Sequence, residues 1–210
     1  MSAFGDITVA IPAHPARVAN GMLDRAVASV RNQLHPAADI SIAIDEHGDG
    51  AAITRQRALD AVKTEWVAFL DSDDVFYPEH LRVLAAGAKI FKADYVFSYY
   101  MVHFPDGKPW PANDPLGHFG KPFNPAAPHQ TTITTLVRTE LAKAVGFHEP
   151  PPDSIVGGHR GGEDWHFTIG CVDAGAKFYH AARRTWGWTH HRGNSSGIPG
   201  RGDAAPRRQP

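Results

Sequence analysis

The sequence predicts an α/β protein in which helices cover both faces of a mainly parallel central sheet. Short β-branched runs alternate with segments of helical periodicity over roughly the first 95 residues, which is typical of parallel strands joined by helical crossovers. Residues 66–70 (WVAFL) are apolar throughout, as expected for a parallel strand buried on both faces. Three aspartates follow within four positions, at the strand end where such sheets bind ligands.

Local patterns place three strands and three helices in this first half. The expected strands are residues 7–11, 40–44 and 66–70, and the expected helices are residues 18–34, 54–62 and 79–89. Within the first helix, Leu23, Val27 and Val30 recur at the spacing of an amphipathic helix. Pro78 precedes the last helix and suits its first turn, where a backbone N–H is not needed.

The second half is less regular. Its expected strands are residues 95–102, 131–137, 177–180 and 185–190, and its expected helices are a short one capped by Thr139 and residues 163–174. Residues 104–128 contain many Pro, Gly and Asn, which predicts a long functional loop such as a lid or specificity loop. A second mobile loop is expected between Pro150 and Gly162.

Composition indicates one ordinary globular domain, which we expect over residues 1–197, with a disordered tail over residues 198–210. The chain has 210 residues, 42% hydrophobic and 20% charged. Its net charge of −1 gives no general attraction to nucleic acid, and no stretch approaches the ~20 apolar residues of a membrane span. Cys171 is the single cysteine and the first residues lack a signal-peptide pattern, so we expect a cytoplasmic protein.

The aspartates after residues 66–70 are the strongest functional signal. Asp71 and Asp73 form a D-x-D motif at the end of a strand, and Asp74 follows directly. Carboxylates two positions apart on a turn can bind one hard divalent cation and leave positions for phosphate and water. A helix N-cap is the alternative, but it accounts for one aspartate better than for three.

Two further pairs of residues carry possible chemistry. Glu163 and Asp164 begin a helix directly after a glycine-rich stretch; acidic residues are ordinary in a first helical turn, yet a carboxylate there could also act as a general base. His190 and His191 leave a strand into a polar segment and are either structural or metal ligands.

Arg55 and Asp45 are weaker candidates. Arg55 lies with Arg57 on the helix before the third strand, where both could simply be solvated charges. Asp45 ends the second strand and either binds a base or starts a turn.

The order of these motifs resembles the family 2 glycosyltransferases, which are inverting enzymes with the GT-A fold. The resemblance covers roughly residues 5–197. It rests on the segments ITVAIPAHPAR, LDRAVASVRNQ, SIAIDEHGDG, TRQRAL, FLDSDD, LVRTELAKAVGFHE, GGEDWHFTIGCVDAGAKFYH and THHRGNSS. Each motif is weak by itself, whereas their order and spacing together are specific.

The resemblance implies transfer of a sugar from a nucleoside diphosphate sugar to an acceptor hydroxyl. Asp164 would be the general base, and Asp73 and His191, rather than His190, would bind Mn²⁺ or Mg²⁺. The residues expected to bind the donor are Pro12, Ala13, His14, Asp45, Arg55, Asp71, Ser72 and Asp73. Glu163, Asp74 and His190 would support the site. The acceptor, the sugar and the base are not identified by the sequence, and neither is the oligomeric state.

The sequence departs from the family pattern at several points. The frequent Asp-Asp-Gly-Ser after the second strand is here Asp45-Glu46-His47-Gly48, and Gln56 replaces the usual Asn after Arg55. The Q-x-x-R-W motif and the membrane segment that processive synthases usually carry are both missing from the sequence. These absences favour a non-processive transferase that adds one sugar.

Two other functions remain as alternatives. Residues 71–75 also fit the D-x-D-x-[TV] nucleophile loop of haloacid-dehalogenase-like phosphatases, in which Asp71 and Asp73 would be catalytic. In those enzymes this strand comes first, whereas here two expected strands precede it. The second alternative is a non-catalytic module that binds a nucleotide sugar, which would lose nothing when Asp164 is replaced.

Overall fold

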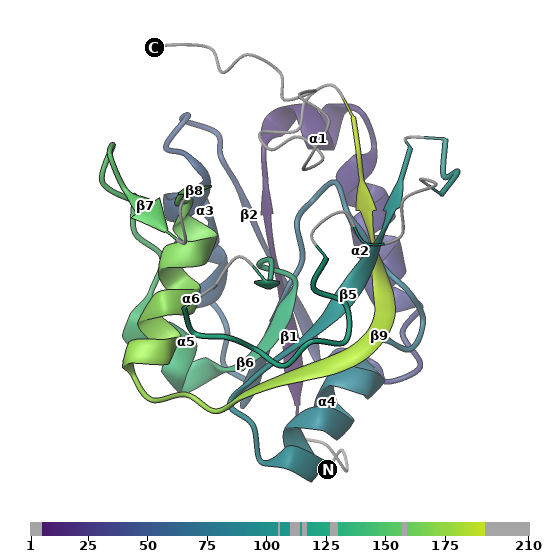
Figure 1. The fold of residues 1–210 in the computed structure, drawn as a ribbon. Coiled ribbons are helices and arrows are strands. Elements are labelled where there is room, and N and C mark those ends of the chain that lie inside the picture. Colours follow the sequence, from purple (N-terminus) through teal and green to yellow (C-terminus); the bar gives the residue numbers. More distant parts are fainter. Residues whose placement is uncertain are drawn as a thin grey trace.

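The computed structural model describes residues 6–104, 106–109, 114, 117–126, 130–156 and 159–191. These residues form one seven-stranded sheet with helices on both faces (Figure 1). The expected tail over residues 198–210, the domain boundary at residue 197 and part of the expected loop over residues 104–128 lie outside the described residues.

The order of strands in the sheet is β2-β1-β3-β6-β5-β9-β4. The strands are β1 (Ile7–Ala13), β2 (Asp39–Ile44), β3 (Trp66–Phe69), β4 (Val75–Phe76), β5 (Tyr95–His103), β6 (Thr135–Arg138) and β9 (Phe178–Thr189). Strands β2, β1 and β3 are parallel, β6 is antiparallel to both β3 and β5, and β9 is parallel to β5 but antiparallel to β4. In the described part of this sheet, most strands therefore share one direction and β6 and β4 oppose it, which confirms the mainly parallel sheet.

Helices cover the two faces of the sheet and bury two apolar clusters. The helices are α1 (Pro15–Ala19), α2 (Met22–Arg31), α3 (Ala51–Asp60), α4 (His80–Phe91), α5 (Thr139–Val145) and α6 (Glu163–Asp173). Helices α2 and α4 pack on one face, with Leu23 and Leu84 in the cluster that contains Val9 of β1. Helices α3, α5 and α6 pack on the other, with Leu59 and Phe167 in the cluster that contains Phe69 of β3. Alternate residues of one strand thus serve opposite faces.

Local sequence patterns misplaced some boundaries. The helix expected over residues 18–34 is two helices, because Gly21 adopts a left-handed φ of 77° between α1 and α2. Thr139 is the first residue of α5, whose N-cap is Arg138, so the predicted cap was wrong by one position. The two strands expected over residues 177–190 are one strand, β9, with register shifts opposite Tyr99.

Three short strands were not expected. Strand β4 pairs with the end of β9, and a hairpin of β7 (Ile155–Val156) and β8 (His159–Arg160) lies within the expected glycine-rich loop. Strands this short carry too little periodicity to be recognised locally.

The topology brings several chain segments to one end of the sheet. The carboxyl ends of β1, β2, β3, β5 and β9 lie there because these strands share a direction. The residues before β6 reach the same end because β6 runs the opposite way. Most of the predicted site residues follow these strand ends. None of the helices in the described part of the chain has the length and apolarity required to cross a membrane.

Helix α6 is held by close packing on its neighbours. The ring of Phe167 stacks on Phe147 at a centroid distance of 4.4 Å and meets Phe69 edge-on at 5.6 Å. Gly170 lets α6 approach α5, because a Cβ at this position would lie 2.5 Å from Val145 Cγ1. Figure 1 shows the two helices side by side.

We expect Gly170→Ala to destabilise the protein although alanine favours helix by about 1 kcal/mol over glycine. The new methyl group has no room beside Val145, and overpacking of this kind costs typically ~1–3 kcal/mol. Chemical denaturation of the four members of a double-mutant cycle with Val145→Ala measures the effect. The penalty should largely vanish in the Val145→Ala background; an equal penalty in both backgrounds would contradict the contact.

Candidate active site

A cavity of about 280 Å³ lies beyond the carboxyl ends of β1 and β3. All eight residues predicted to bind the donor line it, together with Arg17, Gly50, Ala51 and Thr54. The eight residues come from the end of β1, the turn after β2, helix α3 and the turn after β3. The structure therefore brings them together, while their roles in binding remain predictions.

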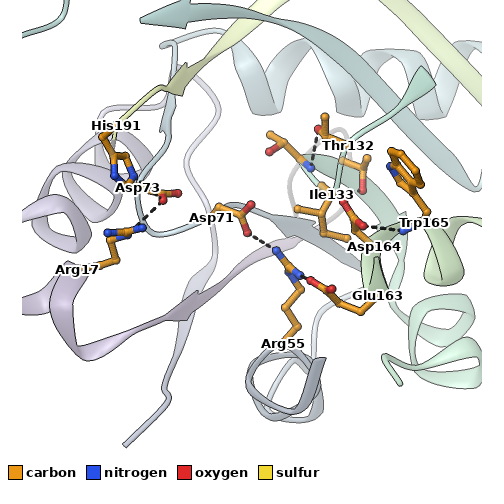
Figure 2. A network of polar contacts seen from close by, with 12 residues as sticks. Arg17, Arg55, Asp71, Asp73, Thr132, Ile133, Glu163, Asp164, Trp165 and His191 are labelled. Carbon is orange, nitrogen blue, oxygen red and sulfur yellow. Dashed lines mark hydrogen bonds and ion pairs between the residues drawn. The ribbon is translucent and has the colours of Figure 1, made fainter. Parts of the chain in front are cut away.

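Arg55 connects three parts of the site. It lies on α3, is only 8% exposed, and its Nη2 is 2.7 Å from Asp71 Oδ1 while its Nη1 pairs with the carboxylate of Glu163 (Figure 2). Burial alone would lower the pKa of Arg55, but the adjacent carboxylates outweigh it and raise that pKa. The guanidinium therefore stays charged and ties α3, the turn after β3 and the start of α6 together.

Asp164 lies beside this bridge at the start of α6. Its Oδ1 accepts the N–H of Trp165 at 2.8 Å (Figure 2). Burial, and secondly the negative charge of Glu163, raise the pKa of Asp164 to about 6. A carboxylate with that pKa is ionised at neutral pH and is a stronger base than an ordinary aspartate.

Asp73 lies on the other side of Asp71 from Asp164 (Figure 2). Its Oδ2 is 3.0 Å from His191 Nε2 and 3.2 Å from Arg17 Nε. Burial would raise the pKa of Asp73, but the hydrogen bond from His191 and the charge of Arg17 outweigh it and lower that pKa. Asp73 is therefore an ionised carboxylate with two donors on one oxygen.

Asp74 has a structural partner instead of facing the cavity. It is 3% exposed, and its Oδ1 accepts the N–H of Thr189 at 2.8 Å. Burial first, and then the charge of Asp73, raise the pKa of Asp74. This bond holds the turn after β3 against the end of β9, two residues before His191. The N–H of His190 donates to the carbonyl of His103 at 2.7 Å, which fixes the same segment.

The residues around Asp73 fit a divalent cation. Carboxylate oxygens of Asp71, Asp73 and Asp74 lie within 4.8 Å of one another. The 3.0 Å between Asp73 Oδ2 and His191 Nε2 equals the separation of adjacent ligands around an octahedral ion with bonds of ~2.1 Å. A carboxylate oxygen and an imidazole nitrogen are both common ligands of divalent metal ions. Asp74 fits less well, because its carboxylate already bonds the backbone of β9.

Asp45 also makes structural bonds while lining the cavity. Its two carboxylate oxygens accept the N–H groups of Asp49 at 2.7 Å and Gly50 at 3.2 Å. These bonds close the turn between β2 and α3. The two interpretations of Asp45 from the sequence are therefore compatible, since a turn residue can still face a ligand.

Arg17 is the charged residue missed by sequence reasoning among the described residues that line the cavity. It lies in the short helix after β1, lines the cavity and contacts Asp73. The sequence offered one signal for Arg17, namely a basic residue shortly after the carboxyl end of a strand. Its partner could not be read from the sequence, because 56 positions separate the two residues.

We expect Arg55→Met to lower the free energy of unfolding by about 2–4 kcal/mol at neutral pH, because it leaves partly buried carboxylates without their cation. The loss should be smaller near pH 5. Burial raises the pKa of Asp71 and Asp164 while the charge of Arg55 lowers it, so removal of Arg55 raises both pKa values further. The native state of the variant then binds protons more tightly than that of the wild type, and the variant regains stability relative to the wild type as pH falls.

Urea denaturation at both pH values measures this difference, with Arg57→Met as the matched control. Arg57 pairs with Asp49 on the surface, so its loss should cost little at either pH. Equal losses for Arg55→Met at both pH values would contradict the electrostatic account.

Comparisons with known proteins agree with this architecture. The model of the family described as Glycosyl transferase family 2 matches residues 37–148, which is 112 of the 210 residues. A comparison with curated proteins gave no match.

Solved structures with a similar fold include S. aureus TarS. Its 1-349 fragment in complex with UDP-GlcNAc matches with a TM-score of 0.67 and 18% identity, over 90% of this chain and 60% of that chain. The same fragment in complex with UDP matches with a TM-score of 0.63 and 17% identity, over 88% and 60%. The chain thus spans about 60% of the length of this fragment, and at this identity the likeness establishes the fold. With just over half of its length matched by the family model and the predicted GT-A fold confirmed, the chain belongs to glycosyl transferase family 2.

Proposed function

We propose that this protein transfers one sugar from a nucleoside diphosphate sugar to an acceptor hydroxyl, with inversion at the anomeric carbon. The observation that carries the proposal is the placement of Asp164, a carboxylate with a pKa of about 6, across Asp71 from the pair formed by Asp73 and His191 (Figure 2). Membership of the family supports this proposal, and so does the fold shared with TarS, whose fragment was solved in complex with UDP-GlcNAc.

The donor would occupy the cavity between β1, α3 and the turn after β3. Its nucleoside would lie against His14 and Asp45, and its diphosphate against the turn from Asp71 to Asp73, all of which line the cavity. Asp73 and His191 would hold Mn²⁺ or Mg²⁺. When bound, the cation would supply positive charge for the diphosphate that leaves.

Asp164 would accept the proton of the attacking hydroxyl. Inversion requires the hydroxyl to attack from the side opposite the leaving diphosphate. Asp164 and Asp73 lie on opposite sides of Asp71 (Figure 2), which suits such an in-line displacement. Arg55 holds Glu163 next to Asp164 and so helps to set the position and the pKa of the base.

The two alternatives from the sequence carry less support. Family membership and the two strands that precede β3 disfavour a haloacid-dehalogenase-like phosphatase. A non-catalytic module would bind the donor without turnover in the wild type, and the turnover measurement below tests this alternative. The first experiment is a thermal-shift series of nucleoside diphosphates and sugar nucleotides with Mn²⁺, because a specific ligand raises stability by RT ln(1 + [L]/Kd).

We expect binding of the selected nucleoside diphosphate to require a divalent cation and to weaken at least about tenfold in His191→Ala. His190→Ala is the matched control, because its backbone, not its side chain, makes the bond to His103. Calorimetry with Mn²⁺ and then with EDTA measures both effects. Equal affinity for the nucleoside diphosphate with and without the cation would contradict the metal site. A larger loss of affinity in His190→Ala than in His191→Ala would make His190 the metal ligand.

We expect Asp164→Asn to lower turnover by ~10²–10⁴-fold, the usual contribution of a general base, and to leave donor affinity nearly unchanged. The assay is release of the nucleoside diphosphate from the selected donor, with water or an identified acceptor, beside direct measurement of donor binding. Near-normal turnover would refute the base assignment, whereas a wild type that binds the donor and shows no turnover would favour the binding module.

The pH dependence of kcat/KM distinguishes a catalytic role of Asp164 from a structural one. Because Asp164 must be ionised, kcat/KM should rise with pH through about 6 and then level off. Glu163→Gln removes the second cause of the raised pKa, so the acid limb should move to lower pH.

A further inference from the structure

Arg17 contacts the carboxylate that a bound cation would also contact. Its side chain lies at the wall of the cavity, and its Nε is 3.2 Å from Asp73 Oδ2. The same oxygen is 3.0 Å from His191 Nε2. Arg17 is therefore one of two donors on the atom that the proposed function assigns to a divalent cation.

A divalent cation at Asp73 and a guanidinium at Asp73 repel one another. Arginine cannot lose its proton in a protein, so this repulsion is relieved only when the side chain moves. Arg17 has a long, flexible side chain that remains 16% exposed, and it lies on the short helix α1. It can swing without disturbing the sheet.

The cavity itself offers the guanidinium a new partner once a donor is present. Arg17 and Arg55 are the two arginines among the described residues that line it. Arg55 is already held by Asp71 and Glu163, whereas Arg17 is paired with the proposed cation ligand. A diphosphate that enters the cavity would bring negative charge that Arg17 can contact bidentately.

We propose that Arg17 couples cation binding to diphosphate binding, by leaving Asp73 for the diphosphate when the cation arrives. The inference rests on the proposed function, because it assumes a nucleoside diphosphate in this cavity. It assigns Arg17 two effects of opposite sign. Arg17 weakens binding of the cation alone and strengthens binding of the diphosphate.

The test is calorimetry of Mn²⁺ alone, and of UDP and GDP at saturating Mn²⁺, in the wild type, Arg17→Met, Arg17→Lys and Arg57→Met. Arg17→Met should bind Mn²⁺ alone several-fold more tightly and bind UDP at least about fivefold more weakly. A fivefold change is at the lower end of the ~5–150-fold range in which one bound ligand usually changes the affinity for another. Arg17→Lys keeps the charge and should remain near the wild type for Mn²⁺. Arg57→Met removes the same charge from a residue paired with Asp49 and should change neither affinity.

The outcomes separate the two proposals. If the wild type binds neither UDP nor GDP with Mn²⁺, the proposed function fails and this inference fails with it. If the wild type binds UDP but Arg17→Met binds Mn²⁺ alone no more tightly, only the role of Arg17 is overturned. Weaker Mn²⁺ binding in Arg17→Met would make Arg17 a support of the cation site and would also overturn the proposal. Circular dichroism of each variant verifies that it is folded.

Discussion

The buried guanidinium of Arg55 is the interaction on which the site depends. It pairs with Asp71, 16 positions away, and with Glu163, 108 positions away. Burying a cation costs free energy that only well-placed carboxylates can offset, so the three groups specify each other's positions. The start of α6, and with it Asp164, is thereby fixed relative to the turn after β3.

The three aspartates of the FLDSDD segment do not share a partner. Asp71 pairs with Arg55, Asp73 with His191 and Arg17, and Asp74 with the backbone of Thr189. Like charges this close in sequence would repel one another if they shared one environment. Because their partners lie on α3, on α1 and at the end of β9, the three aspartates connect one short turn to all three elements. The packing of α6 serves the same site, because Phe167 anchors the helix in the apolar cluster around Phe69 and Glu163 in its first turn can then pair with Arg55.

The sequence by itself determined the strands β1, β2 and β3, the helix between β2 and β3, and the residues at the ends of these strands. These features depend on local periodicity and on the shared direction of parallel strands, and both can be read along the chain. The order of motifs was also sufficient to identify the family. For the same reason, all eight predicted donor residues line one cavity.

Only the tertiary structure decided which partners these residues have. The contacts of Arg17 with Asp73, of Asp74 with Thr189 and of β4 with β9 join segments that are 56 to 115 positions apart or lack a local signal. Gly21 divided a helix that apolar spacing alone would continue. Each of these outcomes is set by burial and by competition for hydrogen-bond partners in the folded chain. Neither can be predicted from a short stretch of sequence.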